Sequence, residues 1–170
     1  MRTATFALFL GIIYLSVGLL GLIPEALTPP PADAPPTQVR MLYGYLFGLF
    51  PVNVLHSAAH LVIGAWGIVA WRLHTGARAY ARAVAILYGA LAVIGVIPGW
   101  ETLFGLAPIH GPDVWLHAGT GAIAAYFGWR AEIAPERRAG ESTDRRQQAV
   151  PVPHERRFGH SDRRDPFSEV

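Results

Sequence analysis

The hydrophobic positions of this chain gather in long stretches that polar positions rarely interrupt. Residues 6–23, 52–71, 83–97 and 114–129 contain no acidic or basic residue other than histidine. The strongly polar side chains inside these stretches are Asn53, His56, His60 and His117. Because a helix needs about 20 apolar residues to cross about 30 Å of hydrocarbon, each stretch has roughly the length of a membrane span. The pattern predicts four transmembrane helices, over about residues 6–23, 52–71, 79–97 and 113–129.

These stretches are expected to be helices and not strands, since a backbone inside a bilayer must satisfy its own hydrogen bonds. A soluble helical bundle is the alternative. A soluble helix would carry polar residues along one face at the 3.6-residue period, and residues 6–23 offer only Tyr14 and Ser16. The composition is more hydrophobic and less charged than that of a typical soluble domain, with 52% hydrophobic and 15% charged residues. We therefore expect an all-α membrane protein whose main partner is the lipid bilayer.

The first stretch also has features of a secretory signal, because Arg2 precedes it and residues 32–34 form a small-residue cleavage pattern. Its apolar run exceeds the usual signal core, and Pro35 would be the first mature residue. We expect a retained span.

The arginines predict how the helices are oriented. They lie before the first span, between the second and third spans, and after the fourth span: Arg2, Arg72, Arg78, Arg82 and Arg130. The other two connections hold Arg40 against four acidic residues, Glu25, Asp33, Glu101 and Asp113. Since positively charged loops stay on the cytoplasmic side, both termini are expected in the cytoplasm of a bacterial inner membrane.

Residues 132–170 differ in character from the four-helix transmembrane domain predicted over residues 1–131. From Arg130 onward the chain carries 9 arginines and 8 acidic residues, so the segment is a polyampholyte and a disordered cytoplasmic tail is expected. Nucleic-acid binding is not supported, because acidic residues are interleaved with the basic ones. In the first connection, the proline-rich residues 27–37 predict an extended linker. Residues 41–50 predict an interfacial segment or one that folds back on the helices.

An internal repeat relates the two halves of the chain. One constant offset along the sequence places Gly48 on Gly105, Pro51 on Pro108, His60 on His117 and Gly64 on Gly121. A second, longer offset places Tyr14 on Tyr88, Gly21 on Gly95 and Pro24 on Pro98. The proline-rich insert accounts for the difference between the two offsets. We expect two pseudo-repeated helix pairs, related by an axis along the membrane normal.

The repeat places His56 on Asp113, so that one half carries His56-x3-His60 and the other Asp113-x3-His117. Residues four apart share one face of a helix, and Gly64 or Gly121 extends each face with a small residue. The pattern predicts an inward-facing polar layer near the outer leaflet, made of Asn53, His56, His60, Asp113 and His117.

The segments FPVNVLHSAAH and GLAPIHGPDVWLH resemble the domain-of-unknown-function family numbered 4383, which consists of small bacterial four-span membrane proteins. The resemblance covers about residues 6–129. It implies the fold and the location but no activity, and its polar positions correspond to Asn53, His56, His60, Asp113 and His117. The family pattern has asparagine at the positions that His110 and Val114 occupy here.

Three functions remain open for the polar layer. The first is a structural or interaction role without a cofactor, in which the side chains hydrogen-bond across helices and Asp113 caps the fourth helix and orients His117. The second is a redox or metal site, either a b-type haem between His60 and His117 or a divalent ion held also by His56 and Asp113. The third is transport of protons or a small solute through His60, His117 and Asp113.

An enzyme of the hydrolase or transferase class is not expected. The chain has no cysteine, and it lacks a nucleophile motif or a glycine-rich phosphate loop. Glycines on the first two helices instead favour close helix packing or a homo-oligomer interface: Gly11, Gly18, Gly21, Gly64 and Gly67.

Overall fold

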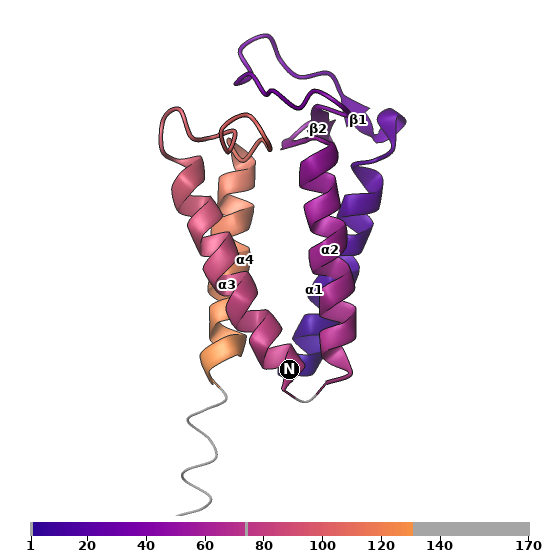
Figure 1. Cartoon of the computed structure of the whole chain (residues 1–170), viewed down its shortest axis with the longest axis vertical. Helices are drawn as coiled ribbons and strands as arrows, with labels where there is room; N and C mark the ends of the chain where they lie inside the picture. The colour runs from indigo at the N-terminus through magenta and orange to yellow at the C-terminus, as the bar shows by residue number, and fades with distance from the viewer. Residues whose placement is uncertain (1, 74, 131–170) are drawn as a thin grey trace, which may run out of the picture. The chain divides into compact units, whose positions relative to one another are not determined.

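The computed structural model describes residues 2–73 and 75–130, which form four long helices (Figure 1). They are α1 (Thr3–Leu20), α2 (Val54–Trp71), α3 (Gly76–Gly95) and α4 (Pro112–Trp129). Each overlaps its predicted span, with ends displaced by at most three residues. The predicted disordered tail, residues 132–170, lies outside the described residues.

Among the described helices, α1, α2 and α3 are long and apolar enough to cross a membrane. The helix α4 is as long as α1, at 18 residues, but it is less apolar because Asp113 and His117 occupy its first two turns. Large apolar side chains are exposed on all four helices, among them Phe9, Val62, Val93 and Ile123. A membrane protein presents such faces to lipid.

The helices pack as two pairs, α1 with α2 and α3 with α4, and Figure 1 shows each pair side by side. In the first pair, Gly64 lies against the backbone of Leu15 and Gly11, where an added Cβ would come within 2.5 Å of the Leu15 nitrogen. In the second pair, Gly121 lies against the backbone of Gly89, at 3.0 Å on the same measure. Small residues therefore bring the helix axes close together.

A core of buried side chains joins the two pairs. It contains three tyrosines, Tyr14, Tyr80 and Tyr88, together with apolar residues from α1, α3 and α4. The rings of Phe6 on α1 and Phe127 on α4 stack at a centroid distance of 4.6 Å. The aromatic rings fill the space that the glycine contacts leave between the pairs.

The first connection, residues 21–53, contains a structure that the all-α prediction missed. A 3-10 helix, η1 (Pro24–Ala26), leads into a three-stranded antiparallel sheet in the order β1 (Leu27–Thr28), β2 (Gly44–Leu46) and β3 (Phe50–Val52). Phe47 and Gly48 both have positive φ, at 54° and 70°, and turn the chain between β2 and β3. Strands of two or three residues are too short to show an alternating pattern, which is why the sequence did not reveal them.

This connection also contacts the second one, residues 96–111, at the same end of the helices (Figure 1). The backbone N–H groups of Gln38 and Val39 both donate to the Gly105 carbonyl, at 2.9 and 3.2 Å. The proline-rich segment predicted as an extended linker is therefore followed directly by residues that hydrogen-bond to the other half of the chain. The opposite end of the helices holds the N-terminus and the short link between α2 and α3 (Figure 1).

Candidate functional site

Asn53 is the N-cap of α2, and its amide connects the helix to both connections. Its side-chain oxygen accepts a hydrogen bond from the His56 backbone N–H at 3.0 Å. Its side-chain nitrogen donates to the Val39 carbonyl at 3.1 Å and to the Leu106 carbonyl at 2.8 Å. Asn53 was predicted as a member of the polar layer, but in these bonds its amide pairs with backbone groups and not with the histidine side chains. It positions the start of α2, and His56 with it.

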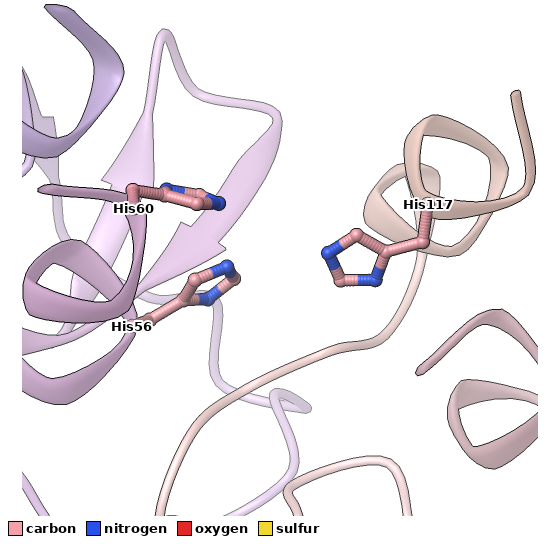
Figure 2. A group of neighbouring side chains, drawn as sticks. All are labelled: His56, His60 and His117. Carbon is pink, nitrogen blue, oxygen red and sulfur yellow. The ribbon is translucent and has the colours of Figure 1, made fainter. Parts of the chain in front are cut away.

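Three imidazoles converge between the two helix pairs (Figure 2). His56 and His60 point from α2 toward His117 on α4, and one ring nitrogen from each lies within 4.8 Å of the others. The ring centroids of His56 and His60 are 4.6 Å apart, and those of His56 and His117 are 6.1 Å apart. All three are buried, with exposed fractions of 5%, 7% and 2%. Equivalent positions of the repeat, His60 and His117, thus contribute to one cluster.

Asp113 adds a carboxylate to this cluster. Its Oδ2 atom lies 3.6 Å from His117 Nε2 and 4.0 Å from His56 Nε2, both longer than a hydrogen bond. The sequence predicted that Asp113 would also cap α4, and this was wrong. Gly111 is the N-cap, with a φ of 64° that favours glycine, and no side chain caps the helix. The Asp113 side chain is free to turn inward.

In each of the four clustered side chains, one polar atom lacks the hydrogen-bond partner that a buried polar atom normally has. Within the described part of the chain, the Nδ1 atoms of His56, His60 and His117 and the Oδ2 atom of Asp113 are buried without any hydrogen bond. Most buried polar atoms in folded proteins are paired, so a group of unpaired ones calls for an ion, a water or a ligand. The hydrogen bonds across helices that a purely structural role requires are not formed by these atoms.

Two tyrosine rings pack against the histidines of the cluster. The Tyr14 ring lies 5.0 Å from the His60 ring, and the Tyr88 ring lies 5.1 Å from the His117 ring. The Tyr14 hydroxyl donates to Thr120 Oγ1 at 3.2 Å. The sequence related Tyr14 and Tyr88 through the repeat, but it gave no role to Thr120. Its position one turn after His117 on α4 was the available signal.

His110, a further histidine of the second connection, lies apart from the cluster. Its ring centroid is 6.2 Å from that of Tyr45 on β2. Burial lowers the pKa of the His110 imidazole, and the nearby Glu101 carboxylate opposes this effect. Burial also raises the pKa of the Tyr45 hydroxyl to about 12. At neutral pH, His110 and Tyr45 therefore form an uncharged contact between the two connections.

A cavity of about 430 Å³ opens beside the cluster, between α1 and α4. His60, Asp113 and His117 line its inner wall, and Tyr14 and Thr120 lie next to them. The rest of the lining is apolar and comes from α1, α4 and the hairpin of β2 and β3. Mostly apolar pockets with a few convergent polar groups are typical small-molecule sites.

Three imidazole nitrogens and one carboxylate oxygen form a ligand set suited to zinc and related divalent ions. Zinc holds such atoms at about 2.0–2.2 Å, so tetrahedral neighbours lie about 3.3–3.5 Å apart. Asp113 Oδ2 and His117 Nε2 are near that spacing, at 3.6 Å, and one ring nitrogen from each histidine lies within 4.8 Å of the others.

A family model described as Domain of unknown function (DUF4383) matches residues 4–130 of the chain, which confirms the resemblance found in the sequence. Comparison with curated proteins and with solved structures gave no match.

Proposed function

This chain belongs to the DUF4383 family, and on that premise we propose that it is a four-span membrane protein that binds one divalent metal ion between its two helix pairs. His56, His60 and His117 supply nitrogen ligands, and Asp113 supplies an oxygen ligand. The observation that carries the proposal is the convergence of four buried side chains: one ring nitrogen from each histidine lies within 4.8 Å of the others, and Asp113 Oδ2, which has no hydrogen bond within the described residues, lies 3.6 Å from His117 Nε2. A structural layer would have paired them with each other.

Charge balance supports a cation at this place. Asp113 is 4% exposed, and an ionised carboxylate at such a depth is costly unless an opposite charge compensates it. The ion pairs of Asp113 among the described residues are with His56 and His117, whose imidazoles carry a charge only when protonated. A divalent ion supplies the missing positive charge and also occupies the imidazole nitrogens.

A fourth membrane span in α4 is supported by its length and by the placement of its polar residues. Asp113 and His117 are buried, whereas Trp115, Leu116 and Ile123 on the same helix are exposed. The polar side chains that lower its average hydropathy therefore face the protein and not the lipid. A helix of 18 residues with this distribution crosses a membrane in a bundle.

The pseudo-repeat is supported by matching contacts in the two halves. Tyr14 lies beside His60 as Tyr88 lies beside His117, at 5.0 and 5.1 Å. The tight helix contacts match as well. Gly64 contacts Leu15 and Gly11 in the first pair, as Gly121 contacts Gly89 and Ala85 in the second. Gly21 contacts Ser57 in the first pair, as Gly95 contacts Val114 in the second. The contacting residues from the first helix of each pair, α1 or α3, are related by the longer offset of the repeat. Those from the second helix, α2 or α4, are related by the shorter offset. His60 and His117 then lie at one depth around the pseudo-axis, and His56 and Asp113 lie together one helical turn away.

An orientation with both termini in the cytoplasm is supported by arginines at the end that holds the N-terminus. Arg72 lies over the Trp71 ring at 5.8 Å, and Arg130 lies over the Tyr126 ring at 4.6 Å. Arginine with aromatic residues at helix ends is typical of the membrane interface, and an excess of arginine marks its cytoplasmic side. The metal site is then near the outer leaflet of a bacterial inner membrane.

Metal content tests the proposal. The full-length protein, purified in mild detergent, is stripped with a chelator, reloaded with Zn²⁺ or Co²⁺, and analysed for bound metal by elemental analysis. We expect one ion per chain in the wild type and a loss of at least tenfold in affinity in His60→Ala and His117→Ala. His110→Ala is the matched control, because it removes a histidine outside the cluster, and it should bind as the wild type does.

Visible absorption of the Co²⁺-loaded protein reports the ligand geometry, and a tetrahedral site gives an intense band that an octahedral aquo ion lacks. Wild-type protein that binds no more Zn²⁺ or Co²⁺ than the His60→Ala/His117→Ala double variant would overturn the proposal. The layer would then have the structural role that the sequence favoured.

A further inference from the structure

The cavity beside the cluster opens toward the lipid-facing side of the protein. Its rim includes Phe9 and Ile13 on α1 and Leu116 and Ile123 on α4, all of which are exposed. Because α1 and α4 make few contacts with each other, these side chains frame a lateral opening. In a membrane, a molecule that enters between α1 and α4 comes from the hydrocarbon layer and not from water.

The interior of the cavity is divided between an apolar wall and a polar end. Leu10, Val17 and Leu46 belong to the apolar wall, whereas His60, Asp113 and His117 form the polar end. Of the four proposed ligands, only His56 does not line the cavity. One side of a metal held there is consequently turned toward the cavity, where it can accept a fifth ligand in addition to the three histidines and Asp113.

Charge at the polar end selects the head group of an occupant. A divalent ion together with the Asp113 carboxylate leaves one net positive charge, which is costly to keep in an apolar setting. One further singly charged oxygen ligand makes the site neutral, and a carboxylate is such a ligand. The Thr120 hydroxyl, which accepts from Tyr14 at 3.2 Å, has its own hydrogen left to donate to the second carboxylate oxygen.

Resting on the proposed metal site, we infer that the cavity between α1 and α4 binds one long-chain fatty acid from the membrane. Its carboxylate coordinates the metal, and its chain lies along the apolar wall toward the lateral opening. The volume of about 430 Å³ is near the lower end of the range for ligand pockets, which suits a single acyl chain. Without the metal, Asp113 repels the carboxylate, so binding depends on the ion.

The experiment measures binding of radiolabelled palmitic acid to the full-length protein in lipid nanodiscs, before and after metal removal. Ile13→Trp narrows the cavity from α1 without touching a proposed metal ligand. Ile12→Trp is the matched control, because Ile12 is the next residue on the same helix and is exposed outside the cavity. Bound metal is counted on the same samples, so that a missing metal site is told apart from a missing fatty-acid site.

We expect saturable binding of about one palmitate per metal-loaded chain, with at least a tenfold loss of affinity after metal removal and in Ile13→Trp. Ile12→Trp should bind as the wild type does, and methyl palmitate, which lacks the charged head, should compete poorly. Equal binding with and without metal would overturn the inference, as would equal binding by the two tryptophan variants at full metal content. Competition by methyl palmitate as strong as by palmitate would also overturn it.

Discussion

The substitution Gly64→Ala tests the close packing that brings α2, and with it His60, to its place. A Cβ added at Gly64 would lie 2.5 Å from the Leu15 nitrogen, 2.8 Å from the Gly11 oxygen and 3.0 Å from the Leu15 Cα. All three atoms belong to the backbone, so no side chain can rotate away. Ordinary contact begins at about 3.4 Å, so α1 and α2 must separate by about an ångström. Overpacking of this kind costs about 1–3 kcal/mol of folding free energy.

The matched control is Gly119→Ala on α4, where an added Cβ meets no atom within 4 Å. It should be neutral or slightly stabilising, since alanine is favoured over glycine in a helix interior by roughly 0.5–1 kcal/mol. Gly121→Ala should fall between the two, because its nearest atom is at 3.0 Å. Unfolding by titration with SDS in mixed micelles, followed by circular dichroism, gives the three free energies. If Gly64→Ala unfolds with the same free energy as Gly119→Ala, the reasoning from backbone contact is refuted.

Three further predictions concern the cap, the topology and the second connection. Asn53→Ala should cost about 2–4 kcal/mol in the same titration, because it removes an N-cap and two bonds to loop carbonyls, whereas Asn53→Asp should keep the cap and lose less. In a chain without native cysteine, Asp33→Cys should react with an impermeant maleimide in intact cells and Thr75→Cys only after lysis; the reverse order would disprove the orientation. Burial lowers the pKa of the His110 imidazole below its value in the unfolded chain. The contribution of neutral His110 to stability is therefore complete above about pH 6.5, and it is lost as the pH falls toward the lowered pKa. Protection of the amides in residues 100–111 against hydrogen exchange should therefore fall on acidification in the wild type, while His110→Gln, which cannot titrate, should show a flat profile of protection against pH.

The sequence predicted the helices well because apolar length is a property of local composition. The stretches that contain Tyr14, His60, Tyr88 and His117 are all helical, and the rings of Tyr14 and Tyr88, which the two offsets align in the sequence, lie 5.2 Å apart. The helix α2 begins at Val54 and not at residue 52, because the Asn53 side chain caps it. A cap of this kind is decided by one side chain, and apolar length does not reveal it.

The cluster itself could be anticipated only in part. Spacing placed His56 and His60 on one face of a helix, and the repeat aligned His60 with His117 and suggested that these two would share one depth. Whether these side chains would hydrogen-bond or gather with unpaired atoms depends on distances across helices, which no local pattern encodes. The role of Asp113 as a cap was wrong because Gly111, with a φ of 64°, is the N-cap and α4 begins at Pro112, which places Asp113 inside the first turn. The cavity depends on the sparse contact of α1 with α4, which are separated in the sequence by α2, α3 and every connection between them.

The pairing of His56 with Asp113 across the repeat has a consequence for how such a site can originate. In a homodimer of single helix pairs, a centre on the two-fold axis receives every side chain twice, so each kind of ligand is present in even number. Three nitrogens and one carboxylate are therefore out of reach for identical subunits, and every substitution changes two ligands at once, so that a change of charge comes in steps of two. Once two such pairs are joined in one chain, each position mutates alone. In the fused chain the ligands no longer have to be present in even number, so the charge of the centre and its preference among metals can be adjusted one residue at a time.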